Sequence, residues 1–409
     1  MKKFNARAFF TKYTMIIALV VVYILFAVLT EGRLLLPQNM SNLLIQNGYV
    51  LVLASGMLLC ILTGGNIDLS VGSVICMTGG LAAVMMKDYN SNPFLVIGLC
   101  LVMGLACGVW HGFWIGYIRI PPFITTLGGM FIFRGVGRLI LDSKTVAPTS
   151  SSWDVFSNIF NSFITIPGLD GGVDPEKGKW VYNEVETLFG TIKAWSPIIV
   201  GVVIVVILMA TTVTNRASKA RHGYRQNSAL VDFGSKGIIS LVILWYCLNL
   251  AQYKGINVML IWVFGVCLLY NFITSKTVTG RYFYAVGGNE KATKLSGINT
   301  NKVYFLAYSS MGLLAGLCGL LVLARVGSVN GSTGNSFEMD AIGSCFIGGA
   351  SAYGGSGKIS GVIIGALLLG VINMGMSILG IGDSWQYVVK GGVLLVAVIF
   401  DVMSSKKGK

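Results

Sequence analysis

The sequence predicts an all-α membrane protein, a polytopic bundle of about 10–12 transmembrane helices. Of the 409 residues, 54% are hydrophobic and only 11% are charged, whereas soluble domains carry about 25% charged residues. Apolar runs close to the ~20 residues that cross a bilayer recur along the chain, and the mean hydropathy is +0.75. Most of the protein must therefore face lipid, and a single membrane domain, 1–409, is expected.

The basic residues predict which loops face the cytoplasm. The net charge is +14, but Lys and Arg gather in short segments between apolar runs, which is typical of cytoplasmic loops and argues against nucleic-acid binding. The first apolar run, 13–30, follows four basic residues and lacks a small-x-small cleavage site, so it predicts an uncleaved first span. Counting alternate loops from there places both termini in the cytoplasm.

The expected spans follow the apolar runs in chain order. They are 13–30, 43–62, 69–86, 94–118, 122–141, 196–214, 237–251, 257–273, 303–324, 341–353, 359–380 and 385–402. Segment 341–353 is short enough to be re-entrant instead of crossing the membrane.

The longest polar segment, 142–195, is predicted to be an extracytoplasmic loop. Its acidic residues outnumber its lysines, so it is either a docking surface for an extracytoplasmic protein or a loop without a contact role. The eight cysteines all lie in apolar runs outside it. They predict small buried hydrophobic residues, and neither a disulfide framework nor a metal site.

Glycines recur at every fourth position of span 94–118. These glycines are Gly104, Gly108, Gly112 and Gly116. On a helix in a membrane, such a stripe lets two backbones approach closely. Two later pairs, Gly312 with Gly316 and Gly361 with Gly365, repeat the device. The pattern predicts helix packing in a bundle and says nothing of function.

The stretch 63–73 interrupts the apolar sequence between two spans. Two glycines break the helix there, and Asn66, Asp68 and Ser70 follow. Irregular backbone at membrane depth is tolerated only inside protein or along a watery cavity, and an acid in such a place is a candidate functional residue. The alternative interpretation is that Asp68 caps the next helix.

The stretch 343–361 repeats this glycine-rich pattern, which suggests an internal duplication of a broken-helix unit. It also contains Gly-Ser-Gly-Lys, part of a phosphate-binding loop. That interpretation fails, because Ala352 replaces the required first glycine and Ile359 replaces the Ser or Thr that holds Mg²⁺.

The polar, basic segment 274–302 is predicted to carry a short exposed helix on the cytoplasmic side. Asn289 is a good N-cap, and Glu290 lies in the first turn, four residues before Lys294, at salt-bridging distance. Gly297 supplies the left-handed residue that ends a helix. A two-turn helix needs a surface to lie on, which favours a docking site for a soluble partner over a solvated loop.

The sequence lacks the constellations of an enzyme or of an ion-driven pump. Its two histidines, His111 and His222, belong to no HExxH motif, and there is no GxSxG. His111 is expected to be a packed residue of the bundle. Asp68 is the one acid expected inside the spans, whereas Lys390, Arg134 and Arg138 are expected to snorkel. The energy for any transport must then come from another subunit.

Three blocks of the chain resemble a known family, the permease subunits of ribose- and xylose-type ABC sugar importers, and most closely the multiple-monosaccharide, xylose-like branch. The blocks are 64–73, 280–298 and the combination of 338–342, 348–349 and 353–358. In that family the second block holds a coupling helix with an EAA-like motif that docks on the ATPase. The segment 196–251 resembles an added helical pair of the xylose-like branch.

The resemblance implies the partners and the site residues. ATP and Mg²⁺ would bind to a tandem ATPase subunit and not to this chain, a sugar-binding protein would deliver the sugar, and the permease would pair as a homodimer in the cytoplasmic membrane of a prokaryote. The coupling-helix residues would be Arg281, Gly287, Gly288, Asn289, Glu290, Ala292, Lys294 and Gly297. Lys291 departs from the family's common alanine.

A path for neutral, hydroxyl-rich sugars needs amide and hydroxyl side chains in the apolar bundle. The residues expected to line it are Gln46, Asn47, Asn66, Asp68, Ser70, Asn373 and Gln386, although each could equally form an interhelical hydrogen bond. The alternative functions are an ion-coupled secondary carrier of sugars or other small solutes and, ranked last, a membrane-embedded transferase.

Overall fold

The computed structural model describes residues 6–173, 180–187, 190–224 and 228–407. The chain forms two compact units, where a single domain was expected. Unit 1 comprises Met1–Glu31, Gln46–Ser162 and Met259–Lys409, and unit 2 comprises Gly32–Ile45 and Phe163–Val258. Each unit is described by itself.

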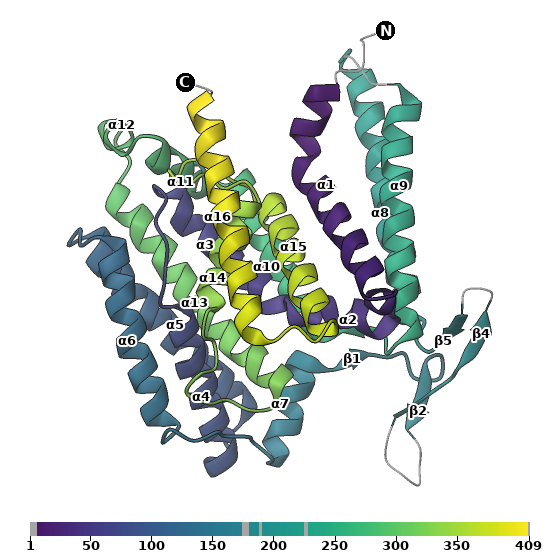
Figure 1. Ribbon diagram of the computed structural model, residues 1–409, viewed down its shortest axis with the longest axis horizontal. Helices are drawn as coiled ribbons and strands as arrows, with labels where there is room; N and C mark the ends of the chain where they lie inside the picture. Colours follow the sequence, from purple (N-terminus) through teal and green to yellow (C-terminus); the bar gives the residue numbers. More distant parts are fainter. Residues whose placement is uncertain (1–5, 174–179, 188–189, 225–227, 408–409) are drawn as a thin grey trace. The chain divides into compact units, whose positions relative to one another are not determined.

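Unit 1 is a bundle of helices built around α3 and α13 (Figure 1). Its helices are α1 (Ala6–Leu29), α3 (Gly48–Leu62), α4 (Val71–Tyr89), α5 (Pro93–Gly116), α6 (Pro122–Ile140), α7 (Ser151–Asn161), α10 (Val258–Lys276), α11 (Val278–Gly288), α12 (Glu290–Leu295), α13 (Thr300–Val326), α14 (Phe337–Ile347), α15 (Ile359–Ile378) and α16 (Asp383–Lys407). Helix α3 is apolar all round and almost wholly buried, as a central helix of a bundle must be. A second core joins α1, α14, α15 and α16 around Ile347 and Leu369.

Unit 2 combines a helical pair with short strands. It contains a 3₁₀ turn (Arg33–Leu35), α2 (Pro37–Gln46), β1 (Phe163–Ile164), β2 (Gly171–Val173), β3 (Trp180–Tyr182), β4 (Val185–Thr187), β5 (Gly190–Ile192), α8 (Ser196–Arg221), α9 (Ala229–Gln252) and β6 (Ile256–Asn257). The strands form the antiparallel pairs β1–β6, β2–β3 and β4–β5. Helices α8 and α9 pack together, with Gly201 against Cys247, as the predicted pair 196–251 requires.

Two features of the loop 142–195 were not predicted. Helix α7 buries Phe156 and Phe160 on one face, so part of the loop belongs to the core of unit 1. The rest forms strands of unit 2, where buried Asp170 accepts hydrogen bonds from the backbone N–H groups of Ile166 (2.7 Å) and Trp195 (2.6 Å). A carboxylate held by two backbone donors fixes the turn that leads into α8.

The helical membrane architecture is confirmed. In the described residues, 9 helices are long and apolar enough to cross a membrane, and Thr14–Leu29 is a shorter apolar stretch. The expected span 341–353 is wrong, because α14 has only 11 residues and is about 16 Å long, roughly half of the hydrocarbon thickness. It is a short helix buried within the bundle.

The glycine stripe of α5 lies directly on α13. A Cβ added to Gly104 would lie 2.6 Å from the carbonyl oxygen of Gly312, one added to Gly108 would lie 2.5 Å from that of Tyr308, and one added to Gly116 would lie 2.7 Å from that of Asn301. No side chain larger than hydrogen fits these positions. The predicted close approach of two backbones is therefore confirmed.

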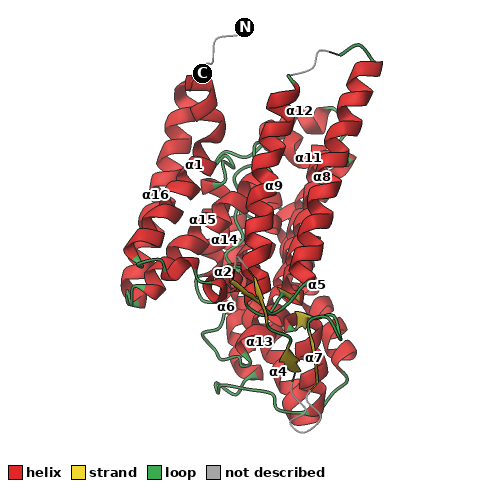
Figure 2. Ribbon diagram, turned by 90° about the vertical axis from the view of Figure 1, so that its right-hand side faces the viewer, coloured by secondary structure: helices red, strands yellow, loops and turns green. Residues whose placement is uncertain are grey.

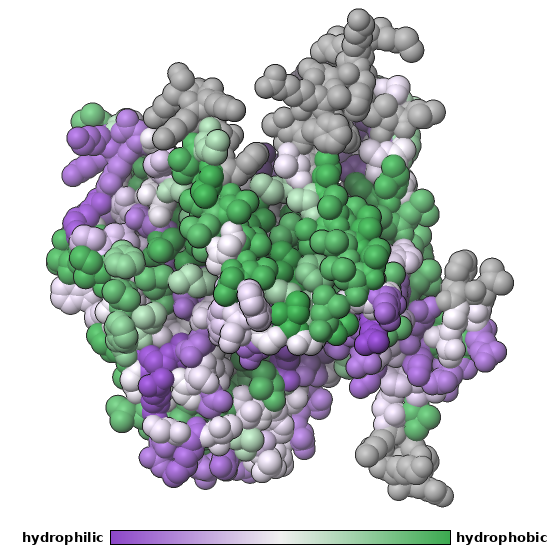
Figure 3. All heavy atoms as spheres, in the orientation of Figure 1, coloured by the Kyte–Doolittle hydropathy of each residue, from purple (hydrophilic) through white to green (hydrophobic). Residues whose placement is uncertain are grey.

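The first turns of α1, the last turns of α16 and helix α12 lie at one end of unit 1 (Figures 1 and 2). The hydropathy of the surface differs between two of these helices: Figure 3 shows apolar side chains over α16 and hydrophilic side chains around α12. The exposed apolar residues of α16 include Val388, Leu395 and Val396, which fits a helix that meets lipid.

Candidate functional site

Helix α12 forms where the sequence predicts a capped helix. The side-chain oxygen of Asn289 accepts a hydrogen bond from the N–H of Ala292 at 2.9 Å, and α12 begins at the next residue, Glu290. Gly297 has a φ of +83° just beyond the helix end, a backbone conformation that glycine adopts without strain. Both caps are confirmed, although the helix has only 6 residues.

Glu290 pairs with Arg119 and not with Lys294, so the expected i,i+4 ion pair is wrong. Arg119, in the loop between α5 and α6, places Nη1 2.6 Å from Oε1 of Glu290, and Tyr304 of α13 donates to Oε2 at 3.1 Å. Partial burial raises the pKa of Glu290, but the hydrogen bonds and the charge of Arg119 outweigh it and hold the pKa below its ordinary value. Glu290 is thus held by two residues outside its own helix, Arg119 in the loop after α5 and Tyr304 of α13, and not by Lys294.

The remaining faces of α12 divide into an anchored face and an exposed face. Thr293 is buried and its hydroxyl donates to the carbonyl of Ala285 in α11 at 2.8 Å. Lys291, Ala292 and Lys294 are exposed, and Leu295 is 90% exposed. The helix is thus held on α11 and α13 while it presents an apolar side chain flanked by two cations.

Helix α11 connects α12 to the interior of unit 1. A Cβ on Gly287 would overlap the carbonyl oxygen of Leu62, at the end of α3, and it would lie 2.4 Å from the backbone nitrogen of Gly355. The hydroxyl of Tyr284 donates to the carbonyl of Gly357 at 2.9 Å. By contrast, Gly288 has open space around it, and the side chain of Arg281 is exposed.

The two glycine-rich stretches that echo each other in the sequence meet in space. A Cβ on Gly354 would lie 2.5 Å from the Cα of Gly64, and one on Gly65 would overlap the carbonyl oxygen of Ala352. Gly355 also donates its N–H to the carbonyl of Leu62 at 3.0 Å. Helix α11 therefore rests on a layer of backbone made by both loops.

Asp68 orders the turn that precedes α4. It is 1% exposed, and its Oδ1 accepts from the N–H of Ser70 at 2.8 Å and from the hydroxyl of Ser70 at 2.7 Å. Asn66 donates to the carbonyl of Thr63 at 3.2 Å. The N-cap of α4 is Ser70, and it makes no side-chain cap hydrogen bond, so Asp68 fixes the turn but does not cap the helix as the alternative interpretation expected.

The other residues expected on a solute path lie in different places. Asn47 is buried between α2 and α3, and a Cβ on Gly370 of α15 would overlap its side-chain amide. Asn373 lies one turn further along α15, and its Oδ1 is buried without a hydrogen-bond partner. The backbone of Gln46 accepts from Arg325 at 3.3 Å, and Gln386 of α16 donates to the carbonyl of Ile381 at 2.9 Å.

The structure contains a buried ion pair that the sequence did not reveal. Asp340 of α14 is 3% exposed, and Nζ of Lys390 lies 3.0 Å from its Oδ1. The hydroxyl of Tyr49 donates to Oδ2 at 2.8 Å, and the Tyr49 ring stacks on Phe337 at 3.8 Å. Asp68 is therefore not the one acid inside the bundle, and Lys390 does not snorkel to the membrane surface.

Arg134 and Arg138 of α6 both reach the loop between α13 and α14. Arg134 is half-buried and donates to the carbonyl of Thr333 at 2.6 Å, whereas Arg138 stays exposed and reaches the carbonyl of Gly331 at 3.5 Å. The sequence signal for the pair of Asp340 and Lys390 is the 338–342 block itself, where two acids stand beside an apolar run.

His111 and the cysteines behave as packing residues, whereas His222 is exposed at the end of α8. His111 is 1% exposed and makes edge contacts with Trp110 and Phe133, at ring-centre distances of 5.2 and 5.3 Å. All eight cysteines are buried and free. Within the described residues, no group of three or more His, Cys, Asp or Glu side chains is placed to hold a metal ion.

Comparison with known proteins identifies the family. Residues 39–398 match the family described as "Branched-chain amino acid transport system / permease component". The chain is 34% identical to the xylose transport system permease protein XylH of Haemophilus influenzae, over 97% of each chain. It is 31% identical to XylH of Escherichia coli K12, over 97% of this chain and 92% of the relative.

A ribose import permease protein, RbsC of Escherichia coli K12, is 29% identical over 98% of this chain and 96% of the relative. No solved structure matches the chain. The matched region runs from α2 to α16 and so includes the glycine stripe of α5 that packs on α13, both glycine-rich loops and α12. The chain is a multi-pass membrane protein that belongs to this family of transport permeases.

Proposed function

We propose that the chain is the membrane-spanning permease of a bacterial ABC importer for monosaccharides, and that ATP hydrolysis in a separate subunit drives it. The relatives' names support xylose or related pentoses and hexoses as the substrate class. The permease supplies only the translocation pathway. ATP and Mg²⁺ bind to the partner, whose hydrolysis opens the pathway alternately to either side of the cytoplasmic membrane.

The observation that carries the proposal is the exposed face of α12. Leu295 is 90% exposed at the tip of a helix that is otherwise fixed by Thr293 and Glu290. Burial of a leucine side chain contributes about 1.5–3 kcal/mol, so this residue gains most by entering an apolar pocket of a soluble partner. Lys291 and Lys294 beside it would meet an acidic rim around that pocket.

The contacts below α12 give a route for motion. The backbone layer made by Gly287, Gly355 and the end of α3 transmits a displacement of α11 to both glycine-rich loops, since packed backbones cannot deform without moving together. The residues Gln46, Asn47, Asn66, Asp68, Ser70, Asn373 and Gln386 are proposed to lie along the path that these loops open. The remaining partners are a tandem ATPase, an extracytoplasmic sugar-binding protein and a second copy of the permease.

Replacing the exposed leucine tests the docking role. Leu295→Asp is expected to leave the chain inserted and folded, because the side chain touches little in unit 1, while it removes the sugar-stimulated ATP hydrolysis of the assembled importer. Leu295→Met is the matched control and is expected to retain it. Normal stimulated hydrolysis in Leu295→Asp would refute the docking role of α12.

Two further variants act on the position of α12. Glu290→Lys breaks the pair with Arg119, and Gly297→Pro cannot adopt a φ of +83°. Both are expected to uncouple transport from ATP hydrolysis while the protein stays in the membrane. Leu295→Asp remains the sharper probe, since it leaves the contacts that hold the helix unchanged.

A further inference from the structure

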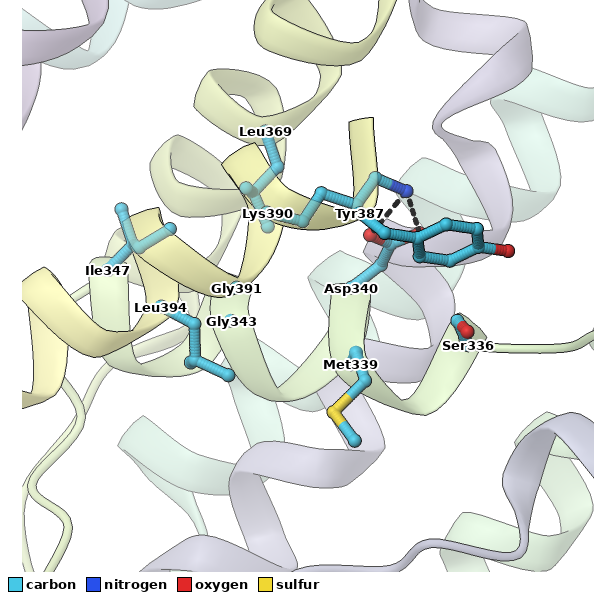
Figure 4. A pocket seen from close by; sticks show the side chains of 10 residues that line it. All are labelled: Ser336, Met339, Asp340, Gly343, Ile347, Leu369, Tyr387, Lys390, Gly391 and Leu394. Carbon is cyan, nitrogen blue, oxygen red and sulfur yellow. Dashed lines mark hydrogen bonds and ion pairs between the residues drawn. The ribbon is translucent and has the colours of Figure 1, made fainter. Parts of the chain in front are cut away.

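We propose that Asp340, Lys390 and Tyr387 form a binding subsite for the hydroxyl groups of a neutral monosaccharide, between α14 and α16. The inference rests on the proposed function and assigns a substrate-contacting site within it. Figure 4 shows the Asp340 and Lys390 side chains pointing toward one another, with the Tyr387 ring beside them.

The position of the ion pair is the first observation. Lys390 is the eighth residue of α16, and seven residues of helix place it about 10 Å from the start of the helix, among the apolar helices of the bundle. Charges there are costly and mark functional sites when they persist. The pair joins residues 50 positions apart, so it fixes no local structure.

The cavity beside the pair is the second observation. Asp340, Lys390 and Tyr387 line a cavity of about 110 Å³ together with Ser336 and Met339. A neighbouring cavity of about 90 Å³ shares Tyr387 and Lys390 and adds Gln386 and Asp383. One water molecule needs about 10–15 Å³ by this measure. The space therefore suits a ligand several times the size of water.

The unused hydrogen-bonding capacity is the third observation. An ammonium group has three N–H donors and a carboxylate has about four acceptor positions. Tyr49 donates to Oδ2 of Asp340, and Nζ of Lys390 lies 3.0 Å from Oδ1 and 3.2 Å from Oδ2. These contacts use three of about four acceptor positions and two of the N–H groups, so one acceptor position and one N–H of Lys390 are left for a ligand. Adjacent hydroxyl groups of a sugar can donate to Asp340 and accept from Lys390 at the same time, without adding a charge to the site.

The backbone and the aromatic ring complete the site. Ser336 starts α14 with a φ of +64°, a strained conformation for serine of the kind that clusters at ligand sites. Tyr387 is 55% exposed and offers a ring on which the C–H face of a sugar can pack. A neutral ligand with both hydroxyl groups and an apolar face fits these three groups better than an ion does.

The test is uptake of D-xylose and its monodeoxy analogues into proteoliposomes that hold the complete importer. Asp340→Asn is expected to raise the half-saturating xylose concentration about ten-fold or more, since a hydrogen bond to a charged group is lost. For one deoxy analogue, the ratio of its half-saturating concentration to that of xylose should be larger with the unaltered chain than with the variant, because the missing hydroxyl is the one that meets Asp340. The binding protein's own preference enters both ratios equally, so it cancels when the two chains are compared.

Two further sets of variants test whether the loss of transport comes from lost contacts with the sugar. Tyr387→Leu removes an exposed ring that folding does not need and should raise the half-saturating concentration about three- to ten-fold, whereas Tyr387→Phe should not. Asp142→Asn removes an exposed carboxylate that also pairs with a lysine, Lys144, and should change nothing.

The outcomes separate the subsite from the function. If the losses from Asp340→Asn and from every deoxy analogue multiply, and Tyr387→Leu transports normally, Asp340 holds helices together and the subsite does not exist. If the unaltered importer accumulates no sugar with ATP, the proposed function falls and the subsite with it.

Discussion

Two helix interfaces of unit 1 are built on opposite principles. Between α5 and α13, glycines bring backbone onto backbone, and a Cβ on Gly108 would lie 2.5 Å from a carbonyl oxygen. Between α14 and α16, Asp340 and Lys390 meet beside a cavity of about 110 Å³. The first interface is backbone packed directly on backbone, so it is suited to stay closed. The second has a charged pair with free space beside it, so it is suited to accept a polar ligand.

The difference also concerns what holds each interface together. Close packing gains many small dispersion contacts that are lost together when the backbones part. A buried ion pair roughly balances its desolvation cost against its attraction, so the intact pair adds little to the strength of the contact between α14 and α16, and its free hydrogen-bonding positions can take ligand hydroxyl groups. A transporter needs one interface of each kind, a rigid frame and a part that moves.

The largest expected effect is at the glycine seam, the contact of Gly104, Gly108, Gly112 and Gly116 with α13. Gly108→Val would press a branched side chain onto backbone atoms of Tyr308 and Ser309, which cannot move aside as side chains do, so the cost should far exceed the ~1–3 kcal/mol of ordinary core overpacking, and we expect little folded protein in detergent. Gly98→Ala is the matched control on the same helix, since nothing lies within 4 Å of a Cβ there. Equal thermal stability of the two variants would show that the seam is not tightly packed.

An intermediate effect is expected from Lys390→Met. This variant leaves Asp340 with Tyr49 as its remaining donor, and an uncompensated buried charge costs about 3–5 kcal/mol. The double variant Asp340→Asn with Lys390→Met should unfold at a higher temperature than the single variant, because no charge is left unpaired. Additive losses of stability would mean that the two side chains do not interact.

The smallest expected effect is at the exposed pair of Arg119 and Glu290, whose side chains are 38% and 36% exposed. Such pairs contribute about 0.2–1 kcal/mol. The folded-state pKa of Glu290 is lowered, so the contribution is present above the carboxylate's ordinary pKa and is lost as pH falls through the folded-state value. The melting temperatures of Arg119→Ala and of the unaltered chain, measured over a range of pH, should thus differ at neutral pH and converge only in acid. A difference independent of pH would contradict the pairing.

The features that the sequence predicted correctly depend on neighbours in the chain or on a regular period. Asn289 caps its helix through a residue three positions away, Gly297 ends the same helix with a positive φ, and the glycine stripe repeats at every helical turn. Local spacing determines such contacts, so they can be recognised without knowledge of the tertiary structure.

The features that were missed depend on distant parts of the chain. Tyr49 and Asp340 are 291 positions apart, and Arg119 lies 171 positions from Glu290, where Lys294 was the nearer candidate. The strands of unit 2 are 2 or 3 residues long, which is too short for an alternating pattern to be recognised. Only the packing of α3 against α14, and of α12 against the loop that follows α5, brings the two pairs of residues together.

The central claim is that this chain is a pathway without a motor of its own. The direct measurement is solute accumulation in proteoliposomes that contain the chain alone, compared with vesicles that also contain the ATPase and the sugar-binding protein. The account predicts accumulation of xylose only in the complete system and only with ATP. Accumulation by the chain alone, abolished by an uncoupler and indifferent to ATP, would contradict it and establish an ion-coupled carrier.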